Sequence, residues 1–340
     1  MNGPGPRWTL GDPAGFAIEV AAIGASWLSC RLPVGGTRRE LLLAPADPEA
    51  HARSPGCAYI GSTVGRVANR IADARLVLDG REWPLVANEG AHQLHGGPEG
   101  FHARPWRPLH VAVDEVLLEL HSPAGDQGYP GALTAQAHYR VDVATCTVHL
   151  SFSAEADAPT PVALSSHAYV NLDGDAADVR GHRLRVAAAQ VLPVDETMIP
   201  LAGPLPVAGT PFDLRTLQPL PADPTLHPQL ARARGLDHCY MLDPACATMQ
   251  APAAELLSAD GRVRLQLATD CVGLQVYSGQ HLGGHAGRDG RPLAPFAGLA
   301  LEPQSLPDAV NRPAWADAGL VLRPGQRWQR RLRWRFEALA

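Results

Sequence analysis

The fold of this chain is set by His138-Tyr139-Arg140-Val141-Asp142-Val143 and, four residues further on, by Val148-His149-Leu150-Ser151-Phe152-Ser153. In both stretches an apolar side chain alternates with a polar one. This period of two is typical of a β-strand with one buried face and one face in water. Two later stretches, 262–267 and 331–336, have the same alternation. The sequence therefore predicts a sheet protein with one large apolar core.

Turn signals outside these strands support the same fold class. Asp79-Gly80 lies between two short apolar segments and predicts a tight hairpin. Glycine and proline are frequent along the whole chain, and only residues 226–234 suggest a short helix. The loops at 122–133, 202–224 and 281–295 are long enough to build a binding surface. We expect an all-β protein, a large antiparallel β-sandwich formed as a single domain over residues 1–340.

Composition excludes several classes of function. The chain has 340 residues, 46% of them hydrophobic, and a net charge of −5 without a basic run, which disfavours nucleic-acid binding. All basic residues are arginines, so the chain has neither a Schiff-base lysine nor a P-loop lysine. No signal peptide or membrane span is apparent in the sequence. We therefore expect a cytoplasmic protein with no membrane partner.

The cysteines and histidines do not form a recognisable metal motif. The six cysteines are scattered without a C-x-x-C pair, and we expect reduced, partly buried thiols. Neither H-x-H nor H-E-x-x-H occurs, and His281 and His285 lie in a glycine-rich loop. The sequence predicts no metal site.

Two distant segments supply candidates for acid and base chemistry. Ser165-Ser166-His167-Ala168-Tyr169 places an imidazole among small side chains. The apolar run Phe296–Leu301 predicts a buried strand that ends on Glu302, at the rim of the core. If the two side chains converge on one pocket, they can act as a general acid/base pair. Taken singly, each residue is better explained structurally, as a core histidine and as an ion-paired glutamate.

Four other segments contain polar side chains that suit a sugar or an anion, although each also has a purely structural explanation. Gly61–Ile71 contains Asn69 and two arginines, Arg66 and Arg70. His95 precedes two glycines, Asp237 lies beside His238 at the start of a predicted strand, and Gln275 shares a strand face with Tyr277.

In their order along the chain, these segments resemble the aldose 1-epimerases, also called galactose mutarotases. The resemblance covers nearly the whole chain. It rests on the following segments: Gly65-Arg66-Val67-Ala68-Asn69-Arg70-Ile71, Leu94-His95-Gly96-Gly97, His167–Leu172, Leu192–Thr197, Gly209–Asp213, Leu236-Asp237-His238, Gln275-Val276-Tyr277 and Glu302-Pro303-Gln304. Ser166, Val170 and Ser305-Leu306 depart from the usual family residues beside the proposed catalytic groups, which leaves the sugar preference open.

The resemblance implies a galactose mutarotase-like supersandwich that interconverts the α and β anomers of free hexoses without a cofactor. Glu302 would be the general base that takes the proton from the C1 hydroxyl, and His167 the general acid that protonates the ring oxygen. Five further residues would hold the sugar: Asn69, Arg70, His95, Asp237 and Gln275. The expected partner is a small sugar, and the protein would be a monomer or a homodimer.

Two alternatives remain open at this stage. An epimerase of a phosphorylated hexose would need a phosphate clamp, to which Arg66 and Arg70 could contribute. A non-catalytic sugar-binding protein on the same fold would not need both Glu302 and His167.

Overall fold

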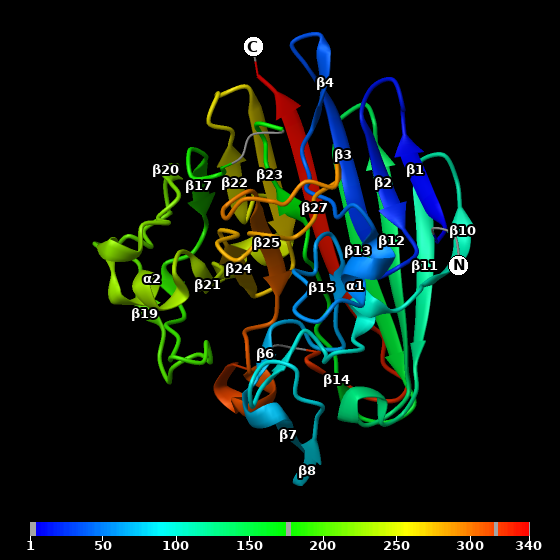
Figure 1. Cartoon of the computed structure of the whole chain (residues 1–340). Helices are drawn as coiled ribbons and strands as arrows, with labels where there is room; N and C mark the ends of the chain where they lie inside the picture. The colour runs from blue at the N-terminus through cyan, green and yellow to red at the C-terminus, as the bar shows by residue number, and fades with distance from the viewer. Residues whose placement is uncertain (1–4, 175–177, 316–318, 340) are drawn as a thin grey trace.

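The computed structural model describes residues 5–174, 178–315 and 319–339, and most of its regular structure is strand (Figure 1). Three antiparallel sheets dominate, with nine, six and four strands.

The nine-stranded sheet contains the strands on which the sequence prediction rests. In spatial order its strands are β10 (Arg107–Val111), β11 (Glu115–Ser122), β12 (Leu133–Asp142), β13 (Thr147–Ala156), β27 (Trp328–Ala338), β23 (Val263–Thr269), β22 (Ala254–Leu257), β17 (Arg183–Val186) and β20 (Gln218–Pro219). Apolar side chains alternate into the core along β12 and β27, as predicted. Val143 differs from the prediction: β12 ends at Asp142, and Val143 lies in the following turn with 38% of its surface exposed.

The other two large sheets pack against the inner face of the nine-stranded sheet. The four-stranded sheet consists of β1 (Arg7–Gly11), β2 (Ala17–Ala21), β3 (Ser26–Val34) and β4 (Thr37–Glu40). The six-stranded sheet consists of β16 (Tyr169–Val170), β25 (Leu299–Gln304), β24 (Gly273–Tyr277), β21 (Asp237–Met241), β18 (Gln190–Val191) and β19 (Leu205–Pro206). Trp27 of β3 lies edge-on to Trp334 of β27, with ring centroids 5.2 Å apart. One buried apolar cluster includes side chains from all three sheets, so the architecture is a β-sandwich.

Short elements connect the sheets. The two-stranded pairs are β5 (Thr63–Val64) with β15 (Ser165–Ser166), β6 (Arg70–Ile71) with β9 (Gln93–Leu94), β7 (Arg75–Leu78) with β8 (Arg81–Pro84), and β14 (Thr160–Pro161) with β26 (Val321–Leu322). The helices are α1 (Pro48–Ala52) and α2 (Pro228–Ala233), and 3-10 turns occupy Ala72–Ala74, Phe101–Ala103, Asp126–Gly128, Pro224–Leu226, Pro244–Thr248, Ala309–Asn311 and Pro313–Trp315. None of the helices in the described ranges has the length and apolar character needed to span a bilayer.

The hairpin and the short helix are found where the sequence predicts them. Asp79 and Gly80 join β7 to β8, and both have positive φ, which is the requirement of a type I′ turn. Helix α2 is shorter than the predicted 226–234, because Arg234 adopts a left-handed conformation that ends it. All six cysteines are free.

The predicted strand at Phe296–Leu301 is displaced along the chain. Phe296 has a φ of +63°, outside the β region, and β25 begins only at Leu299. The strand then continues past Glu302 to Gln304. Pro303 fits there because β16 pairs only with Leu299 and Ala300, so that β25 has the character of an edge strand near Pro303. Glu302 therefore lies inside a buried strand and not at its end.

Candidate active site

One face of the six-stranded sheet supplies the first group of site residues. Gln275 and Tyr277 are two residues apart on β24, and therefore point to the same face. The strand register places Gln275 beside Glu302 of β25, and Tyr277 beside Asp237 of β21. Three strands thus bring Asp237, Gln275 and Glu302 together, although Asp237 and Glu302 are 65 positions apart in the sequence.

His167 is placed opposite this sheet by the backbone between β15 and β16. Its N–H donates to the carbonyl of Ser62 at 2.8 Å, and its carbonyl accepts from the N–H of Gly61 at 3.0 Å. The side chain is 4% exposed. The imidazole is therefore fixed in position by main-chain hydrogen bonds on both sides of its residue.

Asn69 and His95 hold each other at the ends of the short strands β6 and β9. The N–H of His95 donates to the carbonyl of Asn69 at 3.0 Å, and the N–H of Asn69 donates to Nδ1 of His95 at 3.1 Å. Because Nδ1 accepts this bond, the neutral ring of His95 carries its proton on Nε2. Gly96, the next residue, has a φ of +84°, and a Cβ there would lie 1.9 Å from the carbonyl oxygen of Gly65. This close approach explains why a glycine follows the histidine.

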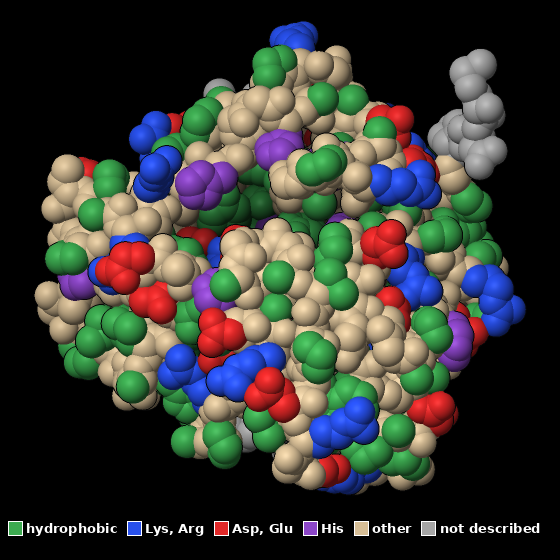
Figure 2. All heavy atoms as spheres, turned by 60° about the horizontal axis from the view of Figure 1, so that its bottom comes forward, with side chains coloured by type: hydrophobic (Ala, Val, Ile, Leu, Met, Phe, Trp, Pro, Cys, Tyr) green, Lys and Arg blue, Asp and Glu red, His purple; other side chains and the backbone are tan. Residues whose placement is uncertain are grey.

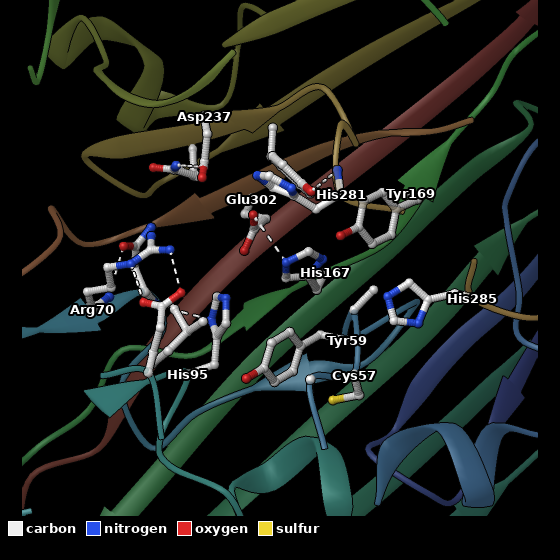
Figure 3. Close-up of a pocket in the computed structure, with 17 residues that line it drawn as sticks. Cys57, Tyr59, Arg70, His95, His167, Tyr169, Asp237, His281, His285 and Glu302 are labelled. Carbon is white, nitrogen blue, oxygen red and sulfur yellow. Dashed lines mark hydrogen bonds and ion pairs between the residues drawn. The ribbon is translucent and has the colours of Figure 1, made fainter. Parts of the chain in front are cut away.

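The seven residues to which the family resemblance assigns a catalytic or binding role all line one pocket (Figure 3). They are Asn69, Arg70, His95, His167, Asp237, Gln275 and Glu302. The cavity measures about 660 Å³ including its open mouth, within the usual size range for small-ligand sites. In the space-filling view the surface is hollowed near the centre, with histidine side chains at the rim of the hollow (Figure 2).

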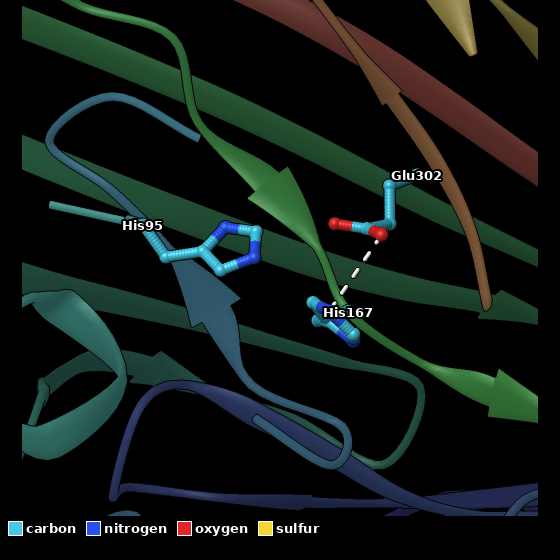
Figure 4. Close-up of side chains that lie close together, drawn as sticks. All are labelled: His95, His167 and Glu302. Carbon is cyan, nitrogen blue, oxygen red and sulfur yellow. Dashed lines mark ion pairs between the residues drawn. The ribbon is translucent and has the colours of Figure 1, made fainter. Parts of the chain in front are cut away.

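His167 and Glu302 face each other within the pocket (Figure 4). His167 Nε2 lies 3.6 Å from Glu302 Oε1, a distance too long for a hydrogen bond. Glu302 Oε2 has no hydrogen-bond partner among the described residues. Burial raises the pKa of Glu302 well above its ordinary range, and the charge of Asp237 raises it further. Burial lowers the pKa of His167 to about 3. Both groups are thus perturbed by desolvation and have polar atoms free to meet a ligand.

A second polar group lies beside this pair. Gln275 Nε2 donates to Asp237 Oδ1 at 2.6 Å. Arg70 donates twice to Glu89, from Nε at 2.5 Å and from Nη2 at 2.8 Å. Burial lowers the pKa of Arg70, but the charges of Asp237 and Glu89 outweigh it and hold the pKa above its ordinary value. Burial raises the pKa of Asp237, and Arg70 opposes that shift.

The described residues contain one group with the spacing of metal ligands: His95, His167 and Glu302 offer ligand atoms within 4.8 Å of one another. The hydrogen bond from Asn69 argues against a metal here. It places a proton on His95 Nε2, whereas a metal ligand needs a deprotonated nitrogen that faces the ion. The arrangement presents an N–H donor to the pocket, which suits a sugar oxygen.

Several residues that line the pocket were not predicted as site residues. Tyr59 contacts His95, with ring centroids 4.6 Å apart, and Tyr169 contacts His167 at 4.9 Å. Cys57 and Glu89 also line the pocket. Tyr277 shares the strand face of Gln275, which is a signal visible in the sequence. Tyr169 lies on the two-residue strand β16, which is too short to show a periodicity. Cys57, Tyr59 and Glu89 lie outside the named strands, where no pattern indicates side-chain direction.

Some sequence candidates lie outside the pocket. Arg66 is 2% exposed and donates to the carbonyls of Pro130 and Gly131, so it holds loops together. His238 lies on the opposite side of β21 from Asp237, and its Nε2 is 3.2 Å from Gln229 Oε1. Of the three loops predicted to build a binding surface, 281–295 contributes His281 and His285, whereas 122–133 and 202–224 contribute no lining residue among those described.

The chain is similar in sequence to known proteins of one family. A family model for aldose 1-epimerase matches residues 6–335. Aldose 1-epimerase of Escherichia coli is 39% identical over 331 residues, which cover 97% of this chain and 94% of that protein. Galactose mutarotase of Rattus norvegicus is 36% identical over 300 residues, which cover 86% of this chain and 82% of that protein.

Two solved structures are similar to this chain in fold. A GalM/aldose epimerase homologue from C. elegans superposes with a TM-score of 0.87 at 26% identity, covering 98% of this chain and 99% of the other. Galactose 1-epimerase from Lactobacillus acidophilus superposes with a TM-score of 0.83 at 29% identity, covering 98% of this chain and 94% of the other. The predicted all-β, galactose mutarotase-like fold is confirmed.

Proposed function

The chain belongs to the aldose 1-epimerase family of isomerases, and we propose that it interconverts the anomers of free hexoses with Glu302 as base and His167 as acid. The observation that carries the proposal is the pair itself. A buried carboxylate and a buried imidazole face each other without a direct hydrogen bond. A sugar that lies against both side chains can contact each of them.

The chemistry needs one proton to leave O1 of the sugar and one to reach the ring oxygen. Glu302 takes the C1 hydroxyl proton while His167 delivers a proton to the ring oxygen, and the C1–ring oxygen bond breaks to give the open-chain aldehyde. Rotation about the C1–C2 bond presents the other face of the carbonyl. Reclosure reverses both proton transfers and yields the other anomer, so the enzyme ends in its starting protonation state.

Before the sugar binds, burial disfavours the charged form of both groups. It raises the pKa of Glu302 and lowers that of His167, which favours a shared proton on the carboxyl. The proposed roles need that proton on His167. Sugar hydroxyls that donate to the Glu302 carboxylate stabilise its anion and so move the proton to His167 on binding.

The remaining polar residues suit a neutral polyol. Asp237 accepts hydrogen bonds, whereas His95 Nε2–H and the Arg70 guanidinium donate them. The runner-up function, epimerisation of a phosphorylated hexose, is disfavoured, because Arg66 is buried elsewhere and Arg70 is already paired with Glu89. A silent sugar-binding protein would have no use for a desolvated acid/base pair.

Polarimetry on freshly dissolved α-galactose and α-glucose tests the proposal. We expect the wild-type protein to accelerate the approach to anomeric equilibrium. Glu302→Gln should lower that acceleration by about 10²–10⁴-fold while the fold is retained, because one positioned acid or base supplies a factor of this size. Glu82→Gln is the matched control, since Glu82 forms an exposed pair with Arg75 on the β7–β8 hairpin. Glu302→Gln activity within about threefold of the control would contradict the role of Glu302.

We further propose that the enzyme is cytoplasmic, acts as a monomer or homodimer, and forms one domain over residues 1–340. Cell fractionation tests the location, sedimentation of the purified protein tests the oligomeric state, and limited proteolysis tests for separable domains.

A further inference from the structure

The pairing of Arg70 with Glu89 has a consequence for the charge of the substrate. Arg70 is the one arginine among the described residues that line the pocket. Its Nε and Nη2 both donate to the carboxylate of Glu89, in the bidentate geometry that guanidinium groups also use to bind phosphates and carboxylates of ligands. Glu89 therefore occupies the edge of Arg70 with which an anionic ligand would pair.

The balance of charge in the pocket also disfavours an anionic ligand. Three carboxyl groups line it, those of Glu89, Asp237 and Glu302, against the single guanidinium of Arg70. The Arg70 side chain is 11% exposed and Glu89 39% exposed, so Glu89 covers Arg70 from the open side. Because burial favours the neutral form of the Glu302 carboxyl, the remaining charges are those of Glu89 and Asp237 against Arg70. This balance is net negative and repels a negative group on a bound sugar.

We propose that Glu89 is a specificity-determining residue, which neutralises Arg70 and thereby restricts the pocket to uncharged hexoses, excluding sugars with a carboxylate or phosphate. The proposal rests on the proposed function, whose substrates are free hexoses. Arg70 Nη1 has no hydrogen-bond partner among the described residues, so it stays available to a neutral sugar hydroxyl.

The test compares galactose with galacturonate, which replaces the C6 hydroxymethyl group with a carboxylate. Polarimetry gives kcat and KM for both sugars with the wild-type protein and with Glu89→Gln. The variant keeps the shape of the side chain but frees the charge of Arg70. We expect the ratio of kcat/KM for galacturonate to that for galactose to rise about tenfold in the variant, because like-charge contacts in a binding site cost this much or more.

The change should appear in KM, because the charge of the sugar is present in the ground state as well as in the transition state. Glu89→Asp keeps the negative charge and should leave the ratio near the wild-type value. Glu82→Gln removes a carboxylate from an exposed pair remote from the pocket, and should not alter the ratio. A ratio within about twofold of wild type in Glu89→Gln, or a rise that Glu82→Gln shares, would overturn the proposal.

A second measurement needs no variant. Added salt screens the repulsion, so higher ionic strength should lower the KM of the wild-type protein for galacturonate and leave that for galactose unchanged. Equal salt responses for the two sugars would overturn the role of Glu89. Failure of the proposed function has a different signature, namely no turnover of galactose by the wild-type protein.

Discussion

The two faces of strands β24 and β25 differ in chemical character although both are buried. On one face Val276 and Leu301 pack into the apolar cluster that joins the sheets. On the other, Gln275 and Glu302 lie beside each other and line the pocket, although they are as buried as their apolar neighbours. Burial of a carboxyl without a hydrogen-bond partner is unfavourable for stability. One face thus stabilises the protein, and the other serves the chemistry.

The comparison predicts that substitutions on the two faces have opposite effects. Changes at the pocket face should abolish turnover with little loss of stability. Changes at the core face should lower stability and leave the chemistry of the folded protein intact.

His167→Asn tests the pocket side of the comparison. We expect kcat to fall by about 10²-fold or more with KM for galactose nearly unchanged, because the proton is transferred only in the transition state while hydroxyl contacts persist in the ground state. Polarimetry over a range of galactose concentrations separates the two constants, and thermal unfolding monitors the fold. A variant that loses stability and galactose affinity together, but whose folded fraction turns over normally, would make His167 a structural residue.

Leu301→Ala tests the core side. Leu301 is 3% exposed and packs in the main apolar cluster, so its truncation leaves a cavity. We expect the free energy of unfolding to fall by about 2–5 kcal/mol. Urea denaturation measures this loss, while kcat per folded molecule should stay near the wild-type value at a temperature where the variant is folded. A large drop in kcat with normal stability would mean that the two faces are not separate in function.

The sheets can be predicted from the sequence because successive side chains of a strand point to opposite faces. The alternation at residues 138–142 and 148–153 therefore predicts β12 and β13 correctly. The same rule places Gln275 and Tyr277 on one face of their strand.

The site is harder to predict. Arg66 and Arg70 are equally plausible in the sequence, yet Arg66 binds loop carbonyls and Arg70 lines the pocket. The segment between them is irregular, with Asn69 at a φ of +65°, so strand parity does not indicate which of the two faces the pocket.

Glu89 and Glu302 show two further limits of prediction from the sequence. Glu89 lies in an irregular segment, and its contact with Arg70 depends on the pairing of β6 with β9, which four residues hold together. Glu302 was expected at the rim of the core, because a carboxylate usually ends an apolar run. A functional site reverses that rule, since a desolvated carboxylate is the stronger base. The apolar run makes Glu302 a candidate for acid/base chemistry, and the resemblance to the aldose 1-epimerases gives it the role of the base.

The pH dependence of kcat/KM measures how strongly the pocket face is desolvated. Turnover needs one proton on the His167–Glu302 pair. Below the pKa of His167 a second proton binds and activity falls. Burial lowers that pKa to about 3, so the acid limb should lie far below the ordinary histidine value near 6.5. On the alkaline side activity falls when the last proton leaves, and the raised pKa of Glu302 moves that limb upward.

We therefore expect no fall in kcat/KM as the pH is lowered from 7.5 to 5, after subtraction of the spontaneous rate. Glu82→Gln should give the same profile as the wild-type protein. A halving of kcat/KM near pH 6.5 would show that His167 titrates as an exposed histidine does, and that the pocket face is not desolvated.

The smallest expected effect is that of metal removal, which tests whether the polar residues of the pocket face act through protons alone. His95, His167 and Glu302 are close enough to suggest a metal site, so the prediction is not trivial. The hydrogen bond from the N–H of Asn69 to Nδ1 of His95 leaves the proton on Nε2, which points a donor and not a lone pair into the pocket. Binding of a metal ion by Nε2 would require His95 to give up that hydrogen bond or to lose its last proton, and both are unfavourable in a buried ring. Dialysis against a chelator should therefore leave kcat and KM for galactose unchanged, with the metal content checked by elemental analysis before and after. A loss of activity that zinc or another divalent ion restores would show that His95 has the other tautomer, and that the mechanism needs a Lewis acid beside its acid/base pair.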